Sequence, residues 1–163
     1  MNDRLTLWLK QLHPIWFVLL LTSVSFVALV PYAILAAVFP SLSPGPGPLV
    51  SKQGFYEVVF GSVFLAPLLE TALYQALPIE LLSWKTGFSW QVKLLISATL
   101  FGAAHWYSWG YVLSAFLVGL TLAYGYAARR RGRGRPFLLV FLVHGLRNSI
   151  SLTVFALGMR YPS

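Results

Sequence analysis

Five long apolar segments, separated by short polar ones, constrain the fold of this 163-residue chain more than any other feature. A helix needs about 20 apolar residues to cross a bilayer, and lipid offers no hydrogen-bond partner to backbone that is not helical. The segments comprise residues 14–40, 57–84, 94–109, 111–128 and 136–159. We therefore predict an all-α, polytopic integral membrane protein with about five transmembrane helices, folded as a single membrane domain over residues 1–163.

The composition agrees with this fold class and excludes others. Hydrophobic residues make up 58% of the chain and charged residues only 10%, whereas a soluble domain carries about 25% charged residues. Disorder is excluded because it requires low hydrophobicity and high charge. The chain has no cysteine, so disulfides, thiolate metal ligands and cysteine nucleophiles are excluded as well.

The twelve Lys and Arg residues lie mostly between the apolar segments, and their distribution predicts the orientation of the chain. With the N-terminus inside, nine of them fall on the inner side, two fall on the outer side, and Arg147 lies within a span. Positive charge collects on the cytoplasmic side of membrane proteins. We predict a multi-pass protein of the cell (inner or plasma) membrane, with its N-terminus inside and its C-terminus outside.

The net charge of +8 does not require a nucleic-acid partner. Its densest part, RRRGRGR at 129–135, directly follows a span, where basic residues fix topology and meet anionic lipid headgroups. We therefore expect the lipid bilayer as a partner, and no nucleic acid.

The first and fourth segments have structural interpretations. Residues 14–40 are too long for the core of a signal peptide, so we expect a retained helix, kinked at Pro31, before an extended Pro/Gly-rich loop at 41–54. In the fourth segment small residues recur at every fourth position, which predicts a face of close helix packing. These residues are Ala115, Gly119, Ala123 and Ala127.

Two prolines flank Glu70, which is the one acidic residue deep inside an apolar segment. Pro67 cannot donate a hydrogen bond to the carbonyl of Val63, and Pro78 cannot donate one to the carbonyl of Tyr74. A carbonyl freed at membrane depth needs water or a side chain as a partner. Two interpretations stay open: a kink that serves packing, or a locally opened and hydrated helix around the carboxylate.

Polar side chains inside the apolar segments are few, and such residues usually mark function in a membrane protein. They are Glu70, Thr71 and Gln75 in the second segment, His105 in the third, and His144, Arg147 and Asn148 in the fifth. His144 and Asn148 lie four residues apart, as do Phe101 and His105, so each pair shares one helix face. Three helices can thus direct a carboxylate, two imidazoles and an amide at one point.

Such a group has the chemistry of a hydrolase. A carboxylate beside an imidazole can hold and deprotonate water, and an imidazole with an amide can donate hydrogen bonds to an oxyanion. A single histidine in a span also serves as an interhelical hydrogen-bond partner, and a single glutamate can be protonated and bonded to a neighbour. The functional interpretation therefore requires these residues to meet.

Three motifs in order resemble those of the CAAX-protease and bacteriocin-processing (CPBP/Abi) family of intramembrane endopeptidases. The family pattern is E-E-x-x-x-R, then F-x-x-x-H, then H-x-x-x-N. This chain has ETALYQ at 70–75, FGAAH at 101–105 and HGLRN at 144–148. The resemblance covers residues 57–159 as a protease-like core and leaves the first helix, 14–40, outside it.

The resemblance implies a role for each matching residue. Glu70 would activate water as the general base, His105 would position and polarise that water, and His144 with Asn148 would stabilise the oxyanion. Phe101, Thr71, Gln75 and Arg147 would serve as structural or substrate-binding support. We favour this glutamate-type mechanism without a cofactor. Zinc held by Glu70, His105 and His144 is the alternative, because one carboxylate and two imidazoles form a known catalytic set.

The first motif departs from the family pattern. Thr71 stands where the family has its second Glu, and Gln75 where it has Arg. Since both members of an i,i+4 pair are replaced, we interpret the change as a neutral substitution in which Thr71 hydrogen-bonds Gln75. Arg147 is interpreted as bonding a backbone carbonyl or reaching the inner surface, with replacement of the missing positive charge as the alternative.

The orientation suggests which substrates the chain meets. Counted along the predicted helices, the group lies about 6–20 Å below the outer boundary, with His105 about four residues from the outer end of its helix. A pocket reached from outside or from lipid favours exported substrates. Small myxosortases resemble this chain in size and remove C-terminal membrane tails, so we expect a sorting-type protease acting on a membrane protein or peptide. The alternatives are a non-catalytic immunity or scaffold protein and a small transporter or proton relay.

Overall fold

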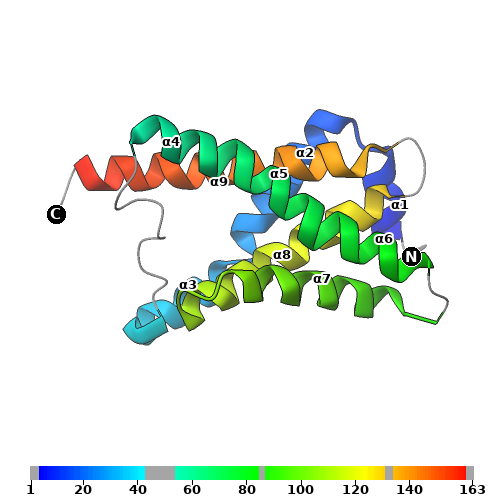
Figure 1. Ribbon diagram of the computed structural model, residues 1–163, viewed down its shortest axis with the longest axis horizontal. Coiled ribbons are helices and arrows are strands. Elements are labelled where there is room, and N and C mark those ends of the chain that lie inside the picture. Colours follow the sequence, from blue (N-terminus) through cyan, green and yellow to red (C-terminus); the bar gives the residue numbers. More distant parts are fainter. Residues whose placement is uncertain (1–3, 43–53, 85–86, 131–133, 161–163) are drawn as a thin grey trace.

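The structure, a computed structural model, describes residues 4–42, 54–84, 87–130 and 134–160. Within these ranges every regular element is a helix (Figure 1). The predicted loop at 41–54 and the basic run at 129–135 lie partly outside the described residues. The helices are α1 (Arg4–Gln11), α2 (Pro14–Val27), α3 (Val30–Val38), η1 (Pro40–Leu42), α4 (Phe55–Phe60), η3 (Gly61–Leu65), α5 (Ala66–Glu70), η4 (Thr71–Ala76), α6 (Leu77–Trp84), α7 (Trp90–Ala104), α8 (Trp109–Arg129) and α9 (Pro136–Arg160).

The structure confirms the predicted fold class. Four helical stretches are long and apolar enough to cross a membrane, namely Pro14–Val38, Tyr56–Trp84, Trp109–Arg129 and Pro136–Leu157. The apolar helix α7 has 15 residues, fewer than the about 20 that a span needs. The chain is therefore an all-α, multi-pass membrane protein, while the fifth span and the orientation of the N-terminus stay predictions.

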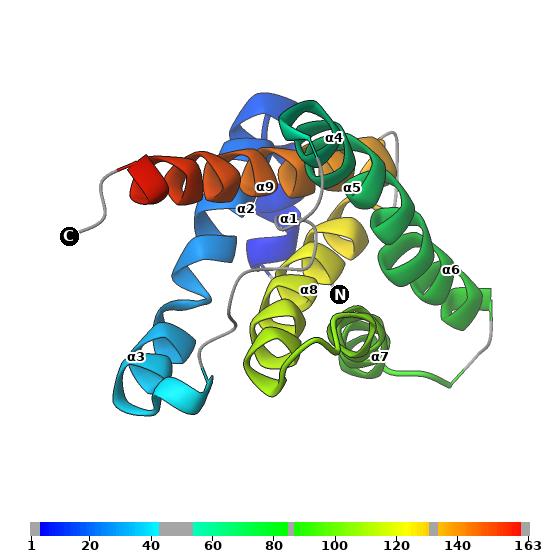
Figure 2. The same cartoon turned by 60° about the vertical axis from the view of Figure 1, so that its left-hand side comes forward.

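The helices form a bundle with the segment α4–α6 along one side. Figure 1 shows α4–α6 as one continuous rod, with α9 beside its first half. The pair α7 and α8 is the most extensive helix contact, and α9 packs against α2, α8 and η3. In Figure 2, turned so that α7 is seen nearly end-on, α8 and α6 lie on either side of it. The bundle thus brings α5, the end of α7 and the middle of α9 together.

The first apolar segment is one helical stretch, Pro14–Val38, with a break close to the predicted kink at Pro31. α2 ends at Val27 and α3 begins at Val30, with Pro31 in its first turn. Pro31 has no N–H to donate to the carbonyl of Val27, so the break falls one helical turn before the proline. The helix α1, which precedes this segment, was not predicted.

The long rod contains two widened turns, and both precede a proline. η3 and η4 are π-helical, with the Ala66 amide donating to the Gly61 carbonyl and the Leu77 amide to the Ala72 carbonyl. The carbonyls that Pro67 and Pro78 leave free lie inside these turns. The helix is therefore widened on both sides of Glu70. This agrees with the interpretation of a locally opened helix around the carboxylate.

A row of leucines marks the lipid-facing side of this rod. Each is about half-exposed although fully apolar, which is the arrangement expected of a surface that contacts acyl chains. A strict four-residue repeat drifts around a helix of 3.6 residues per turn, and the two widened turns offset that drift. The row comprises Leu65, Leu69, Leu73, Leu77 and Leu81.

The seam of small residues on α8 is confirmed. All four predicted members are buried, and a methyl group added at Gly119 would lie 2.9 Å from the Phe101 ring of α7. The closeness of α7 and α8 therefore depends on the absence of a side chain at that position.

The predicted bounds of the third segment, 94–109, were wrong at both ends. α7 begins at Trp90 because the Ser89 hydroxyl caps the helix by accepting a hydrogen bond from the amide of Val92. Lys93, which precedes the predicted segment, is consequently helical. At the other end α7 stops at Ala104, so His105 lies at the end of the helix and not four residues inside it.

Candidate active site

Glu70 contacts two imidazoles that come from two other helices. Its Oε1 lies 3.8 Å from Nε2 of His105, and its Oε2 lies 3.5 Å from Nε2 of His144. Glu70 ends α5, His105 follows α7, and His144 lies within α9. The structure therefore brings together three of the four predicted catalytic side chains.

His105 terminates its own helix and thereby orients its ring. In a continuing helix the Phe101 carbonyl would accept the His105 amide, but it accepts Nδ1 of the His105 ring at 2.7 Å, and the amide donates to Gly102 instead. A carbonyl only accepts, so Nδ1 carries the proton. In the neutral ring Nε2 then presents its lone pair towards Glu70.

The gap between Glu70 and His105 suits a bound water. A direct hydrogen bond of this kind spans about 2.7–3.2 Å, and polar atoms that lie farther apart are commonly bridged by water. A water between the two groups would donate one hydrogen to the carboxylate and one to the Nε2 lone pair. This is the arrangement in which a carboxylate acts as general base.

Phe101 holds both imidazoles. Its ring centroid lies 4.6 Å from that of His105 and 5.5 Å from that of His144, and the ring is almost fully buried. Tyr111, at the start of α8, also stacks on His105, with ring centroids 5.5 Å apart. Tyr111 was not among the predicted site residues. The Ser108 cap that starts α8 three residues earlier was the available signal.

His144 is buried, with 3% of its surface exposed, and its helix approaches the rod closely. A methyl group added at Gly145 would lie 2.8 Å from the Val63 carbonyl, one of the two carbonyls freed by a proline. Gly145 therefore permits α9 to lie against η3 at the level of the site. Within the described residues, Nδ1 of His144 has no hydrogen-bond partner.

Asn148 lies one turn beyond His144 and clamps the widened turn. Its Nδ2 donates to the Ser62 carbonyl of η3 at 2.9 Å, while its Oδ1 accepts from Arg147 at 3.4 Å. One N–H of the amide is thus used structurally.

In the described structure Arg147 contacts Phe26 and Asn148 and not the backbone carbonyl that we expected. Its guanidinium lies over the Phe26 ring of α2, 5.4 Å from the centroid, and donates to Asn148. No bond from it to a backbone carbonyl is found within the described part of the chain. Arg147 therefore links α9 to α2 beside the site, and the interpretation that it bonds a backbone carbonyl is not supported.

Thr71 and Gln75 do not form the hydrogen bond that we predicted. Both side chains are fully buried in η4, and the Thr71 hydroxyl and both polar atoms of the Gln75 amide lack partners among the described residues. The i,i+4 argument assumed a regular α-helix, whereas η4 is widened and displaces side chains four residues apart.

Glu70, His105 and His144 are of the residue types that form a zinc site. Among the described residues, no group of three His, Asp or Glu side chains is arranged to hold a metal ion. The bond from His105 to Phe101 is the kind that orients a metal ligand, and His144 has no such bond. Zinc therefore stays the alternative to the glutamate-type mechanism.

One cavity lies away from this group. It measures about 270 Å³, is apolar, and lies between α7 and α8, with Gly102, Val112 and Phe116 among its lining residues. None of Glu70, His105 and His144 lines it. The candidate active site is therefore identified by the polar side chains that meet there and not by the size of a cavity.

The fold and the site together define a class: a helical, multi-pass membrane protein in which a carboxylate and two imidazoles from three helices meet within the bundle. A family model described as type II CAAX prenyl endopeptidase Rce1-like matches residues 52–150, more than half of the chain. The chain belongs to the CAAX-protease and bacteriocin-processing family of intramembrane endopeptidases, which confirms the resemblance read from its motifs.

Family membership carries a coarse function. It implies a CAAX-type intramembrane endopeptidase that acts on a membrane-associated protein in a lipid bilayer. No curated protein and no solved structure matches the chain. The matched region begins after α3, and the likeness to small myxosortases stays a prediction.

Proposed function

We propose that the chain hydrolyses a peptide bond near the C-terminal tail of a membrane-anchored or exported protein, with Glu70 as the general base. The observation that carries the proposal is the position of the Glu70 carboxylate, 3.5 and 3.8 Å from two imidazole nitrogens of other helices. The match to the endopeptidase family supports it.

The reaction begins with a water between Glu70 and His105. Glu70 takes one proton as the water oxygen attacks the carbonyl carbon of the scissile bond, and the lone pair of His105 Nε2 holds the second hydrogen in place. The carbonyl π electrons move to the oxygen and form a tetrahedral oxyanion. Collapse of the oxyanion breaks the C–N bond, and Glu70 returns its proton to the leaving amine. One water is consumed, and one carboxyl group and one amine are produced.

The oxyanion is held by His144 and Asn148. With Nε2 protonated, His144 donates one hydrogen bond, and Asn148 donates its remaining N–H. The bond from Asn148 to Ser62 restricts the amide to one orientation. A donor that is fixed before the reaction stabilises the developing charge without reorganisation.

The predicted orientation in the cell (inner or plasma) membrane directs this chemistry towards exported proteins. The positive-inside distribution puts the end of α7 at the outer side, and His105 lies at that end. A sorting-type role, in which a C-terminal membrane tail is removed from an exported protein, fits this placement. Cysteines introduced at Trp109 and Lys85 test it, since labelling from outside should reach the former only.

Glu70→Gln tests the reaction. The substitution keeps the size and hydrogen-bonding capacity of the side chain but removes its proton affinity, so turnover should fall at least about a hundredfold, the lower range for a general base. C-termini of membrane proteins are compared by mass spectrometry in cells that express either form at equal levels. New C-termini that depend on Glu70 would identify the substrate and the cleavage site together.

Glu57→Gln is the matched control. Glu57 begins the same span, bonds only the amide of Gly54 in the described structure, and lies outside the site. This variant should retain activity. Identical termini with both wild type and Glu70→Gln, together with a phenotype that the variant preserves, would favour the non-catalytic scaffold or immunity role on the same fold.

A further inference from the structure

A second polar site lies at the opposite end of the bundle from His105. The helix α1, the end of α6 and the start of α7 all lie at this end (Figure 1). A cavity of about 50 Å³ opens there between α1, α6, α7 and α8. One water needs a cavity of about 10–15 Å³. The cavity here therefore accommodates a compact group of a few oxygen atoms.

Three cationic side chains from separate parts of the chain line this cavity. Lys10 comes from α1, Lys93 from α7, and Arg130 from the residue that follows α8. Thr6 and Ser83 complete its polar lining. Donors that converge from several helices on one small space are the arrangement expected of an anion site.

The charges of this cluster are only partly compensated. Arg130 forms an ion pair with Glu80 at 2.8 Å, and Glu80 also accepts from the Tyr126 hydroxyl at 3.1 Å. Lys93 donates to the Ser83 hydroxyl at 3.4 Å. Within the described residues the Lys10 ammonium has no ion-pair or hydrogen-bond partner. Two positive charges therefore face the cavity without a carboxylate to neutralise them.

The backbone that carries Lys10 is fixed in place by the neighbouring Arg129. This side chain is buried, with 5% of its surface exposed. Its guanidinium donates to the carbonyls of Lys10 and Leu12, at 3.2 and 2.5 Å, and lies 4.4 Å from the centre of the Phe17 ring. Arg129 thus holds the end of α1 against α8. The site is built into the packing of the helices and is not a group of freely moving surface lysines.

We propose that this cavity, defined by Lys10, Lys93 and Arg130, binds the phosphate of an anionic phospholipid headgroup. Its volume suits a phosphate group, while the acyl chains remain in the bilayer beside the bundle. Trp90 lines the same cavity, and tryptophan favours the headgroup level of a membrane. Basic pockets between helices on the cytoplasmic side are typical headgroup sites. This proposal is independent of the protease chemistry.

The test compares lipid binding by the full chain in neutral detergent micelles. Phosphatidylglycerol and phosphatidylcholine are titrated, and bound lipid is measured by native mass spectrometry. Each basic residue near an anionic membrane surface contributes about fivefold to binding. The double variant Lys10→Gln/Lys93→Gln should therefore bind phosphatidylglycerol about 25-fold more weakly, with phosphatidylcholine binding unchanged. Inorganic phosphate and glycerol 3-phosphate are added as competitors.

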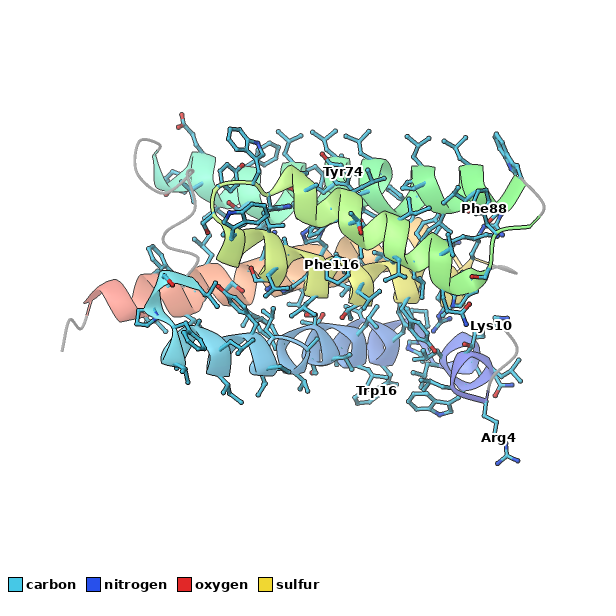
Figure 3. The ribbon with its side chains drawn as sticks, turned by 90° about the horizontal axis from the view of Figure 1, so that it is seen from below. Arg4, Lys10, Trp16, Tyr74, Phe88 and Phe116 are labelled. Carbon is cyan, nitrogen blue, oxygen red and sulfur yellow. The ribbon has the colours of Figure 1, made fainter. Side chains whose placement is uncertain are left out.

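Arg4→Gln is the matched control, because Arg4 belongs to the same helix as Lys10 but is exposed and does not line the cavity. Figure 3 shows Lys10 near the neighbouring helices and Arg4 pointing away from the bundle. Arg4→Gln should change binding less than about twofold, less than the fivefold expected of a residue in the site. The double variant Lys10→Arg/Lys93→Arg keeps both charges and should bind phosphatidylglycerol as the wild type does.

Three results would overturn the proposal: no preference for phosphatidylglycerol in the wild type, an equal loss with Arg4→Gln, or no loss in the double variant. Displacement of the lipid by millimolar inorganic phosphate would assign the same site to a free anion instead of a headgroup. Thermal unfolding in phosphatidylcholine micelles checks the fold of each variant. If the double variant is unfolded, Lys10→Gln alone decides, with a loss of about fivefold expected.

Discussion

Ser97→Ala tests how the bundle compensates for a proline inside a transmembrane helix. Pro78 has no N–H, so the Tyr74 carbonyl lacks its helical donor. The Ser97 hydroxyl of α7 donates to that carbonyl oxygen at 2.5 Å. Ser97 is fully buried, so bulk water does not replace the lost donor when the hydroxyl is removed.

Two known ranges bound the loss of unfolding free energy expected from Ser97→Ala. A buried carbonyl left without a partner costs about 1–3 kcal/mol, whereas interhelical hydrogen bonds in membranes average about 0.6 kcal/mol and reach about 1.7 kcal/mol. The acceptor of this bond has no α-helical donor. We therefore expect Ser97→Ala to lower the free energy of unfolding by about 1.5 kcal/mol, near the upper limit.

A double-mutant cycle isolates the bond. Pro78→Ala supplies an N–H to the Tyr74 carbonyl, so in that background Ser97→Ala should cost less than about 0.5 kcal/mol, which gives a coupling energy of about 1 kcal/mol. Equilibrium unfolding in mixed micelles measures all four proteins. Ser114→Ala is the control, because Ser114 donates to the Tyr111 carbonyl inside the regular helix α8. An equal cost of Ser97→Ala in both backgrounds would refute the reasoning.

Two further predictions concern the candidate site. Gly119→Ala places a methyl group 2.9 Å from the Phe101 ring, and overpacking of this kind costs about 1–3 kcal/mol. Because Phe101 contacts both imidazoles, the rate of proteolysis should fall even where the protein stays folded. Unchanged turnover would show that the position of Phe101 does not matter to the site. If the enzyme is of the glutamate type, activity should survive a zinc chelator, whereas a loss that added zinc reverses would support a metal held by Glu70, His105 and His144.

The helical membrane fold was predictable from the sequence because lipid leaves the backbone few alternatives. A long apolar segment must satisfy its own hydrogen bonds and therefore becomes a helix. The ends of the helices were less predictable, since side chains decide them. His105 ends α7 by taking the Phe101 carbonyl for its own ring, and no hydrophobic pattern reports such competition.

Residue spacing and motif order predicted that Glu70, His105 and His144 meet. They did not predict the hydrogen bond from Asn148 to the backbone of the second apolar segment. Its acceptor, the Ser62 carbonyl, lies in the widened turn η3. Pro67 indicated that this helix opens. The position of the opened backbone relative to α9 depends on tertiary packing, in which Gly145 allows the two helices to approach. Local sequence does not contain that information.

The altered first motif is best understood from the burial of its two residues. Thr71 and Gln75 are both fully buried and unpartnered within the described structure. At such a depth an unpaired charge costs far more than an unpaired neutral polar group. Replacing only one member of a Glu–Arg pair would leave the other charge buried alone, so the two substitutions are tolerable only together. Glu70 is then the one acidic residue between Glu57 and Glu80, so it is the one side chain in the middle of this span that can transfer a proton as a carboxylate.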